Sequence, residues 1–166
     1  MIASTLATVL AEIPMSGTYP EVEFDARGEC TWVKFFDAHE PWVGVFGRGV
    51  AGPELVCQFG EIKAAFVIAR GQGYIVDLLE RKLIESTASP TLQDAATVSA
   101  TNYVVTADWN EVYLFDSKGE IWRSIRLARD GIELVRTSPL VIEGRAEQHD
   151  GWHNFSIDVA TGKLME

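Results

Sequence analysis

Two histidines four residues apart, His149 and His153, could bind a metal ion. On a helix, this spacing would place both imidazoles on one face, as in many zinc sites. The residues between them, Asp150-Gly151-Trp152, are instead typical of a hairpin. Four residues of strand span about 13 Å, which is too far for one zinc ion. We therefore predict a solvated turn here, and no metal site, catalytic residue or cofactor in the chain.

Other residues that could act in catalysis lack the partners that catalysis needs. His39 lies in a turn without a defined acid or base beside it. Cys30 and Cys57 lie in apolar runs with no nearby histidine and no C-x-x-C spacing, which is typical of small buried residues. The glycine-rich Arg70-Gly71-Gln72-Gly73 opens no helix, so it predicts a hairpin turn and not a phosphate site. A non-catalytic protein is favoured, and an enzyme stays an alternative.

The charge of the chain narrows its partners. It has 24 Asp and Glu residues and 14 Lys and Arg residues, for a formal net charge of −10. This balance argues against binding to nucleic acid or to an anionic membrane, and it suits a basic protein partner. The apolar N-terminus has no preceding Lys or Arg and carries Glu12, unlike a signal peptide. We therefore expect a cytoplasmic protein.

A strand-turn-strand unit recurs about every forty residues, most clearly in residues 102–124. The segments 54–87, 92–125 and 132–166 each contain about four short β runs, and the first two align without a gap at an offset of 38. One such unit cannot bury its apolar face alone, so the units must stack. We predict a single domain, residues 1–166, of about three to four four-stranded antiparallel sheets.

The N-terminal part follows other patterns. Apolar residues at helical spacing before Pro14 predict one short helix within residues 1–15, and these residues are Ile2, Leu6, Val9, Leu10 and Ile13. The region 20–50 then predicts a hairpin whose strands are residues 22–25 and 29–36.

Two turn sequences of the repeats resemble β-propeller blades of the quinoprotein or WD-repeat kind. They are Asp116-Ser117-Lys118-Gly119-Glu120-Ile121-Trp122 and Asp158-Val159-Ala160-Thr161-Gly162-Lys163-Leu164. Both resemble the last hairpin of a blade, where Asp begins the turn and Gly supplies the positive φ. The resemblance covers residues 54–166 and implies sheets arranged around an axis. Propellers of these families usually have more than the four blades that this chain offers at most, so an open arc and a closed four-bladed ring both fit.

Equivalent turns of stacked repeats lie on one side of a structure, which should bring residues 70–72, 108–111 and 147–150 together. That face would carry an aromatic residue in an acidic rim, and Trp is enriched at protein interfaces. The candidate binding residues are Asp108, Trp109, Asn110, Glu111, Glu147, His149 and Asp150. The alternative is that Trp109 covers the sheet edge and the acids are only solvated.

Fold and charge together favour a non-catalytic, acidic protein-binding module, such as an inhibitor or immunity-type protein for a basic partner. One alternative is a small enzyme or ligand-binding protein with a pocket between the β sheets. Another is a subunit that forms homo-oligomers through exposed sheet edges.

Overall fold

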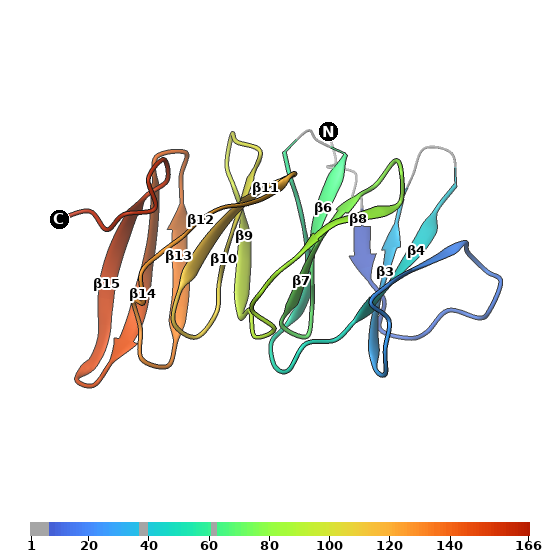
Figure 1. Cartoon of the computed structure of the whole chain (residues 1–166), viewed down its shortest axis with the longest axis horizontal. Coiled ribbons are helices and arrows are strands. Elements are labelled where there is room, and N and C mark those ends of the chain that lie inside the picture. Colours follow the sequence, from blue (N-terminus) through green and yellow to red (C-terminus); the bar gives the residue numbers. More distant parts are fainter. Residues whose placement is uncertain (1–6, 37–39, 61–62) are drawn as a thin grey trace.

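The computed structural model describes residues 7–36, 40–60 and 63–166. Every secondary-structure element in these ranges is a β-strand. The strands form four sheets, which we call A to D in chain order. The sheets follow one another in an open row, with sheet A at one end and sheet D at the other (Figure 1). The predicted all-β, propeller-like arrangement of sheets is confirmed.

Sheets B and C are regular antiparallel repeats with their strands in chain order. Sheet B contains β5 (Glu54–Gln58), β6 (Ala64–Ala69), β7 (Gln72–Asp77) and β8 (Lys82–Ser86). Sheet C contains β9 (Asp94–Val98), β10 (Tyr103–Ala107), β11 (Val112–Asp116) and β12 (Gly119–Arg123). The first strands of the two sheets, β5 and β9, contact each other, so β8 and β12 are the outer strands.

The gapless alignment of sheets B and C at an offset of 38 is wrong by one residue in the central strands. A β-bulge follows Ile75 in sheet B and Leu114 in sheet C, which are 39 residues apart. The turn aspartates Asp77 and Asp116 have the same separation. Strand β6 is buried along its whole length, so its continuous apolar sequence does not distinguish one register from the next.

Sheet D has three strands where four were predicted. They are β13 (Ile132–Thr137), β14 (Val141–Gln148) and β15 (Gly151–Asp158). The chain then turns and returns along β15, where Leu164 forms a bridge with Ile157 and the Met165 N–H donates to the C=O of Ser156 (2.8 Å). This return covers only the last part of β15, whereas a full outer strand covers β7 and β11.

Sheet A does not contain the hairpin predicted from residues 22–25 and 29–36. Its order is β1 (Ala7–Val9), β3 (Cys30–Phe35), β4 (Trp42–Gly47) and β2 (Glu21–Phe24). The hairpin is β3–β4, and β2 lies parallel to β4 at the outer position. A parallel neighbour has no turn signal in the sequence, which is why local patterns missed it.

The predicted N-terminal helix is wrong in the part that the structure describes. Residues Ala7–Val9 form β1, which pairs antiparallel with β3. The Leu10 N–H then donates to the C=O of Trp32 (2.8 Å). Both Ala7 and Val9 pack against the core between sheets A and B, which is the two-residue period of a strand. The predicted helical residues Ile2 and Leu6 lie outside the described ranges.

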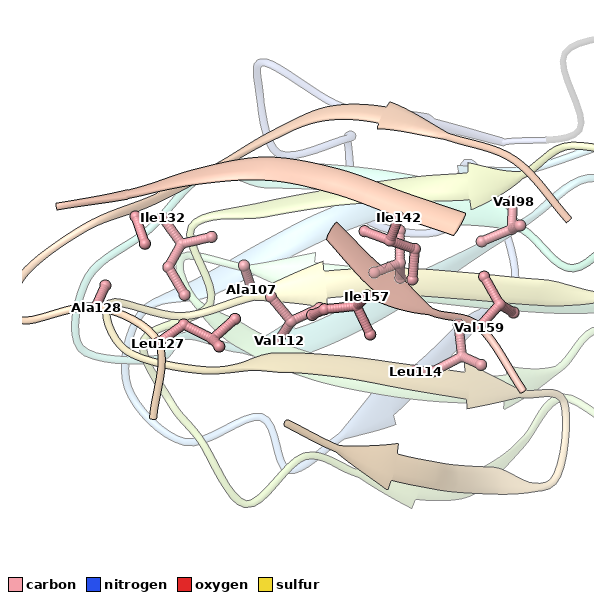
Figure 2. Close-up of a cluster of buried hydrophobic side chains, with 12 residues drawn as sticks. Val98, Ala107, Val112, Leu114, Leu127, Ala128, Ile132, Ile142, Ile157 and Val159 are labelled. Carbon is pink, nitrogen blue, oxygen red and sulfur yellow. The ribbon is translucent and has the colours of Figure 1, made fainter. Parts of the chain in front are cut away.

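Three hydrophobic clusters fill the spaces between consecutive sheets. The cluster between sheets A and B is rich in aromatic residues, and the cluster between C and D is aliphatic (Figure 2). The large buried members of the A–B cluster are Phe24, Phe35, Trp42, Phe46 and Tyr74. Among the described residues, no fourth cluster joins sheet D to sheet A, so the four sheets form an open arc and not a ring.

Tyr74 joins sheets A and B through a buried hydrogen bond. Its hydroxyl donates to the C=O of Gly47 (2.8 Å), and its ring packs 5.3 Å from that of Phe46. Burial raises the pKa of Tyr74 from 10.0 to about 12, and the negative charge of Asp25 adds to this effect. Folding therefore favours the neutral phenol.

We expect Tyr74→Phe to lower the free energy of unfolding by about 1 kcal/mol at neutral pH, because a buried hydrogen bond is lost. In the wild type, the contribution of Tyr74 is complete below about pH 10 and is lost as the pH rises towards 12, since the unfolded chain ionises first. Urea unfolding across this range should show a shallower alkaline decline in the variant. Tyr103→Phe is the matched control, and an identical decline in Tyr74→Phe and wild type would contradict the prediction.

Candidate functional site

The three turns that were predicted to be equivalent are equivalent in the structure. Each is a two-residue turn between the second and third strands of its sheet: Arg70-Gly71, Trp109-Asn110 and His149-Asp150. The first has positive φ at both positions, +47° and +94°, as a type I′ turn requires. We call these three turns the loop row.

The linker after sheet B and the linker after sheet C form the same backbone hydrogen bond to the loop row. The Leu92 N–H donates to the C=O of Gly71 (2.9 Å), and the Leu127 N–H donates to the C=O of Asn110 (2.8 Å). Both leucine side chains are buried between the sheets that their linkers connect. Leu127 and Ala128 lie at one end of the cluster between sheets C and D (Figure 2). The loop row therefore lies along one edge of the arc.

Asp108 holds this edge together and has no free carboxylate oxygen for a partner. Its Oδ1 accepts hydrogen bonds from the backbone N–H groups of Asn110 and Glu111, both at 2.9 Å. Its Oδ2 accepts from the hydroxyls of Ser89 (3.0 Å) and Tyr113 (2.7 Å). Burial raises the pKa of Tyr113, and the hydrogen bond to Asp108 raises it further, so this phenol stays neutral.

Two neighbours of Asp108 in the turn are held by side-chain hydrogen bonds, and the third is exposed. Asn110 Nδ2 donates to the C=O groups of Ala128 (3.2 Å) and Arg129 (2.7 Å). Glu111 accepts a hydrogen bond from the Tyr113 hydroxyl (3.1 Å). The side chain of Trp109 is the exposed one, and the residue keeps 39% of its surface accessible.

The predicted residues of sheet D also have partners. The C=O of Glu147 accepts from the Arg129 N–H (2.8 Å), and His149 Nδ1 lies 2.7 Å from Arg129 Nη1. Asp150 bonds His153 Nε2 (2.7 Å), and this bond lowers the pKa of Asp150. The two histidines thus have separate partners, and the described residues include no group of three His, Cys, Asp or Glu that could hold a metal ion.

Two arginines change the charge of the predicted acidic face. Arg126 donates through Nε to the C=O of Ala128 (3.1 Å) and through Nη2 to the C=O of Arg129 (3.2 Å). Within the described ranges, neither Arg126 nor Arg129 forms an ion pair. The carboxylates of Asp108, Glu111 and Asp150 form hydrogen bonds within the fold, and the linker adds these two cations, which form no ion pair among the described residues. The loop row therefore differs from the acidic rim that the sequence suggested.

In sheets B and C, a Thr or Ser residue pairs with the outer backbone groups at the start of the third strand. In sheet B, the Gly73 N–H donates to Thr87 Oγ1 (3.0 Å) and the Gly73 C=O accepts from the Thr87 N–H (2.9 Å). In sheet C, the Val112 N–H donates to Ser124 Oγ (2.9 Å) and its C=O accepts from the Ser124 N–H (2.8 Å). We call this reciprocal pairing the hydroxyl clasp. The equivalent residue in sheet D, two positions after the turn, is Trp152.

Sheet D has no hydroxyl clasp among the described residues, and part of β15 is an open edge. Ser156 and Asp158 direct their backbone groups towards the returning chain, where they pair with Met165 and Lys163. Strand geometry directs the backbone groups of Trp152 and Asn154 to the same side, where no described residue pairs with them. We call residues 151–154 the open edge.

A groove lies beside the open edge, between β15 and the linker that leaves sheet C. It has a volume of about 420 Å³, and we call it the edge groove; its lining residues are Arg126, Leu127, Ala146, Gln148, His153, Asn154, Phe155, Ser156, Leu164, Met165 and Glu166. A second hollow of about 400 Å³ shares Arg126, Leu127 and Gln148 with it and continues to Arg129 and His149. The open edge thus leads into a groove with a cationic end at the loop row.

The hollow between sheets A and B, of about 370 Å³, has polar groups that satisfy one another. Arg48 pairs with Glu54 (2.7 Å) and Glu29 (3.3 Å), and the Thr31 hydroxyl donates to Glu54 (2.6 Å). Burial raises the pKa of the Cys30 thiol in this hollow. It also raises the pKa of Cys57 to about 11. Both cysteines are free thiols, and these shifts make them poor nucleophiles.

No protein-family model and no curated protein matches this chain. The open edge and the edge groove were missed by sequence reasoning. The signal that could have found them is the hydroxyl residue after each outer strand, Thr87 and Ser124. An offset of 38 pairs Ser124 with Ser86 instead, so the recurrence of the clasp stays hidden.

We expect Asp108→Ala to lower the free energy of unfolding by about 2–3 kcal/mol, because four donors lose their acceptor in a partly buried site. Trp109→Ala should cost less than about 1 kcal/mol, because the side chain is exposed. Thermal unfolding followed by circular dichroism measures both. Asp108→Asn, which keeps one acceptor, should lie between the two, and equally small losses for Asp108→Ala and Trp109→Ala would refute a structural role for Asp108.

Proposed function

We propose that this chain is a non-catalytic protein-binding module that receives an extended segment of a partner protein along the open edge. The observation that carries the proposal is the unpaired outer side of Trp152 and Asn154, at a position that an outer strand fills in sheets A, B and C. An unpaired strand edge is a template for an added strand, whose backbone hydrogen bonds supply affinity. Side chains that enter the edge groove would supply specificity.

Charge supports a different protein over a second copy as the partner. Two copies would each bring a formal charge of −10 to the contact, and like charges oppose association. A basic partner would be steered towards this protein, as an inhibitor or immunity-type protein would need. The described residues contain no helix long and apolar enough to cross a membrane. We also propose a cytoplasmic location, which suits two free thiols.

The alternative of an enzyme or ligand-binding protein with a pocket between the sheets has less support. The three hydrophobic clusters fill the spaces between the sheets. The edge groove lies at the margin of the space between sheets C and D, where Leu127, Ala146 and Phe155 line it, and it opens next to unpaired backbone groups. A site with this position suits a peptide segment better than an enclosed small molecule.

Asn154→Pro tests the proposal because it removes an N–H that faces the open edge and leaves the bonds to β14 intact. Asn154→Ala, which keeps the N–H, is the matched control. A pull-down from native extract followed by mass spectrometry supplies candidates, and each is then purified and measured by calorimetry. We expect Asn154→Pro to weaken binding by about tenfold or more, which corresponds to the loss of one or two backbone hydrogen bonds. Equal affinity for both variants would overturn the proposal.

Hydrogen exchange on the wild-type complex gives a second measurement that needs no folded proline variant. Strand addition predicts that the amides of Trp152 and Asn154 gain protection on binding. Protection confined to the loop row, with none at these two amides, would show that the partner binds elsewhere and would overturn the proposal.

A further inference from the structure

The regular repeats show which residue completes the position next to Trp152. Gly73 and Val112 occupy this position in sheets B and C, and each pairs through both backbone groups with a Thr or Ser. A hydroxyl residue suits the position because one short side chain accepts from the N–H while its own backbone N–H donates to the C=O. An added segment with Ser or Thr here would reproduce the hydroxyl clasp on Trp152.

In an added segment, the residue directly before the hydroxyl residue would face the edge groove, as a comparison with sheet C indicates. In sheet C, that residue is Arg123, which pairs with Tyr113 and lies with its guanidinium 5.0 Å from the Tyr113 ring. His153 is the equivalent of Tyr113 in sheet D, and it lines the edge groove. Since side chains alternate along a strand, the residue of an added segment that precedes its hydroxyl residue would lie over His153.

The edge groove favours a carboxylate at this point. Arg126 lines it, and its guanidinium is held by two backbone carbonyls of the linker, which leaves Nη1 without a hydrogen bond among the described residues. Glu166 is the one acid among the lining residues, and it lies with the returning chain. Arginine recognises carboxylates through charge-assisted hydrogen bonds. A fixed, unpaired arginine beside an open strand edge is thus complementary to an acidic side chain.

We infer that the partner segment carries an acidic residue directly before a Ser or Thr and binds antiparallel to β15. The hydroxyl residue forms the clasp on Trp152, and the preceding carboxylate binds Arg126 in the edge groove. The antiparallel direction is that of β8 and β12 and of the returning chain in sheet D. This inference rests on the proposed function and adds the sequence that the open edge selects.

Two capped peptides of identical composition test the inference, Ac-Lys-Val-Glu-Thr-Lys-NH2 and Ac-Lys-Val-Thr-Glu-Lys-NH2. Their equal charge removes any general attraction to the acidic protein as an explanation. Titration of the full chain, followed by the amide NMR signals of Trp152 and Asn154, measures both affinities. We expect the Glu-Thr peptide to bind about tenfold more tightly, because only this order places both groups opposite their partners.

Arg126→Gln should abolish the preference for Glu-Thr, whereas Arg136→Gln, a matched loss of charge on the outer face of sheet D, should retain it. Equal binding of both peptides at the open edge would overturn the sequence preference and leave strand addition standing. If neither peptide shifts the Trp152 and Asn154 signals, both the inference and the proposed function fail.

Discussion

Pairing of the outer edge of each third strand is the constraint on which the architecture depends. The third strands of sheets B and C, β7 and β11, are buried along most of their length, so their backbone groups must be paired within the sheet. Sheets B and C meet this need with β8 and β12 and end the pairing with the hydroxyl clasps of Thr87 and Ser124. Sheet A meets it with β2, a parallel strand. Sheet D meets it only in part, and the unpaired part is the open edge at which we propose that a partner strand is added.

An open arc needs end sheets whose outer faces tolerate water, and sheet D has such a face. Ion pairs join Glu133 to Arg145 and Arg136 to Glu143, and Arg145 lies 5.7 Å from the Trp152 ring. At the other end, Lys34 donates to the Tyr19 hydroxyl (2.7 Å), which brings the segment between β1 and β2 over sheet A. Polar terminal units are the usual way in which stacked repeats end without closing. The outer face of sheet D is therefore compatible with water, and the binding that we propose is at its open edge and not at this face.

The repeats could be predicted from the sequence because their turns carry local signals, such as the aspartates and glycines at Asp116–Gly119 and Asp158–Gly162. The register between repeats could not, because a strand buried on both faces has no polar alternation to mark its sides. The N-terminal helix failed for a related reason: Val9 and Leu10 fit a helical spacing and a strand equally well over so few residues. The loop row was placed correctly, but its acids were expected to face a partner. Asp108 instead binds the backbone of its own turn and the hydroxyls of Ser89 and Tyr113, and Asn110 binds backbone carbonyls of the linker after sheet C. Ser89 and this linker are distant in sequence from the turn, and only the folded arrangement brings them together.

Amide exchange of the free protein at three equivalent positions tests the account most directly. The hydroxyl clasp predicts slow exchange at Gly73 and Val112, whose N–H groups are bonded to Thr87 and Ser124, and fast exchange at Trp152, whose N–H faces the open edge. The comparison is internal, because the three amides occupy the same place in three sheets. Protection of Trp152 as strong as that of Val112 would mean that the edge of sheet D is already paired, and it would contradict the account.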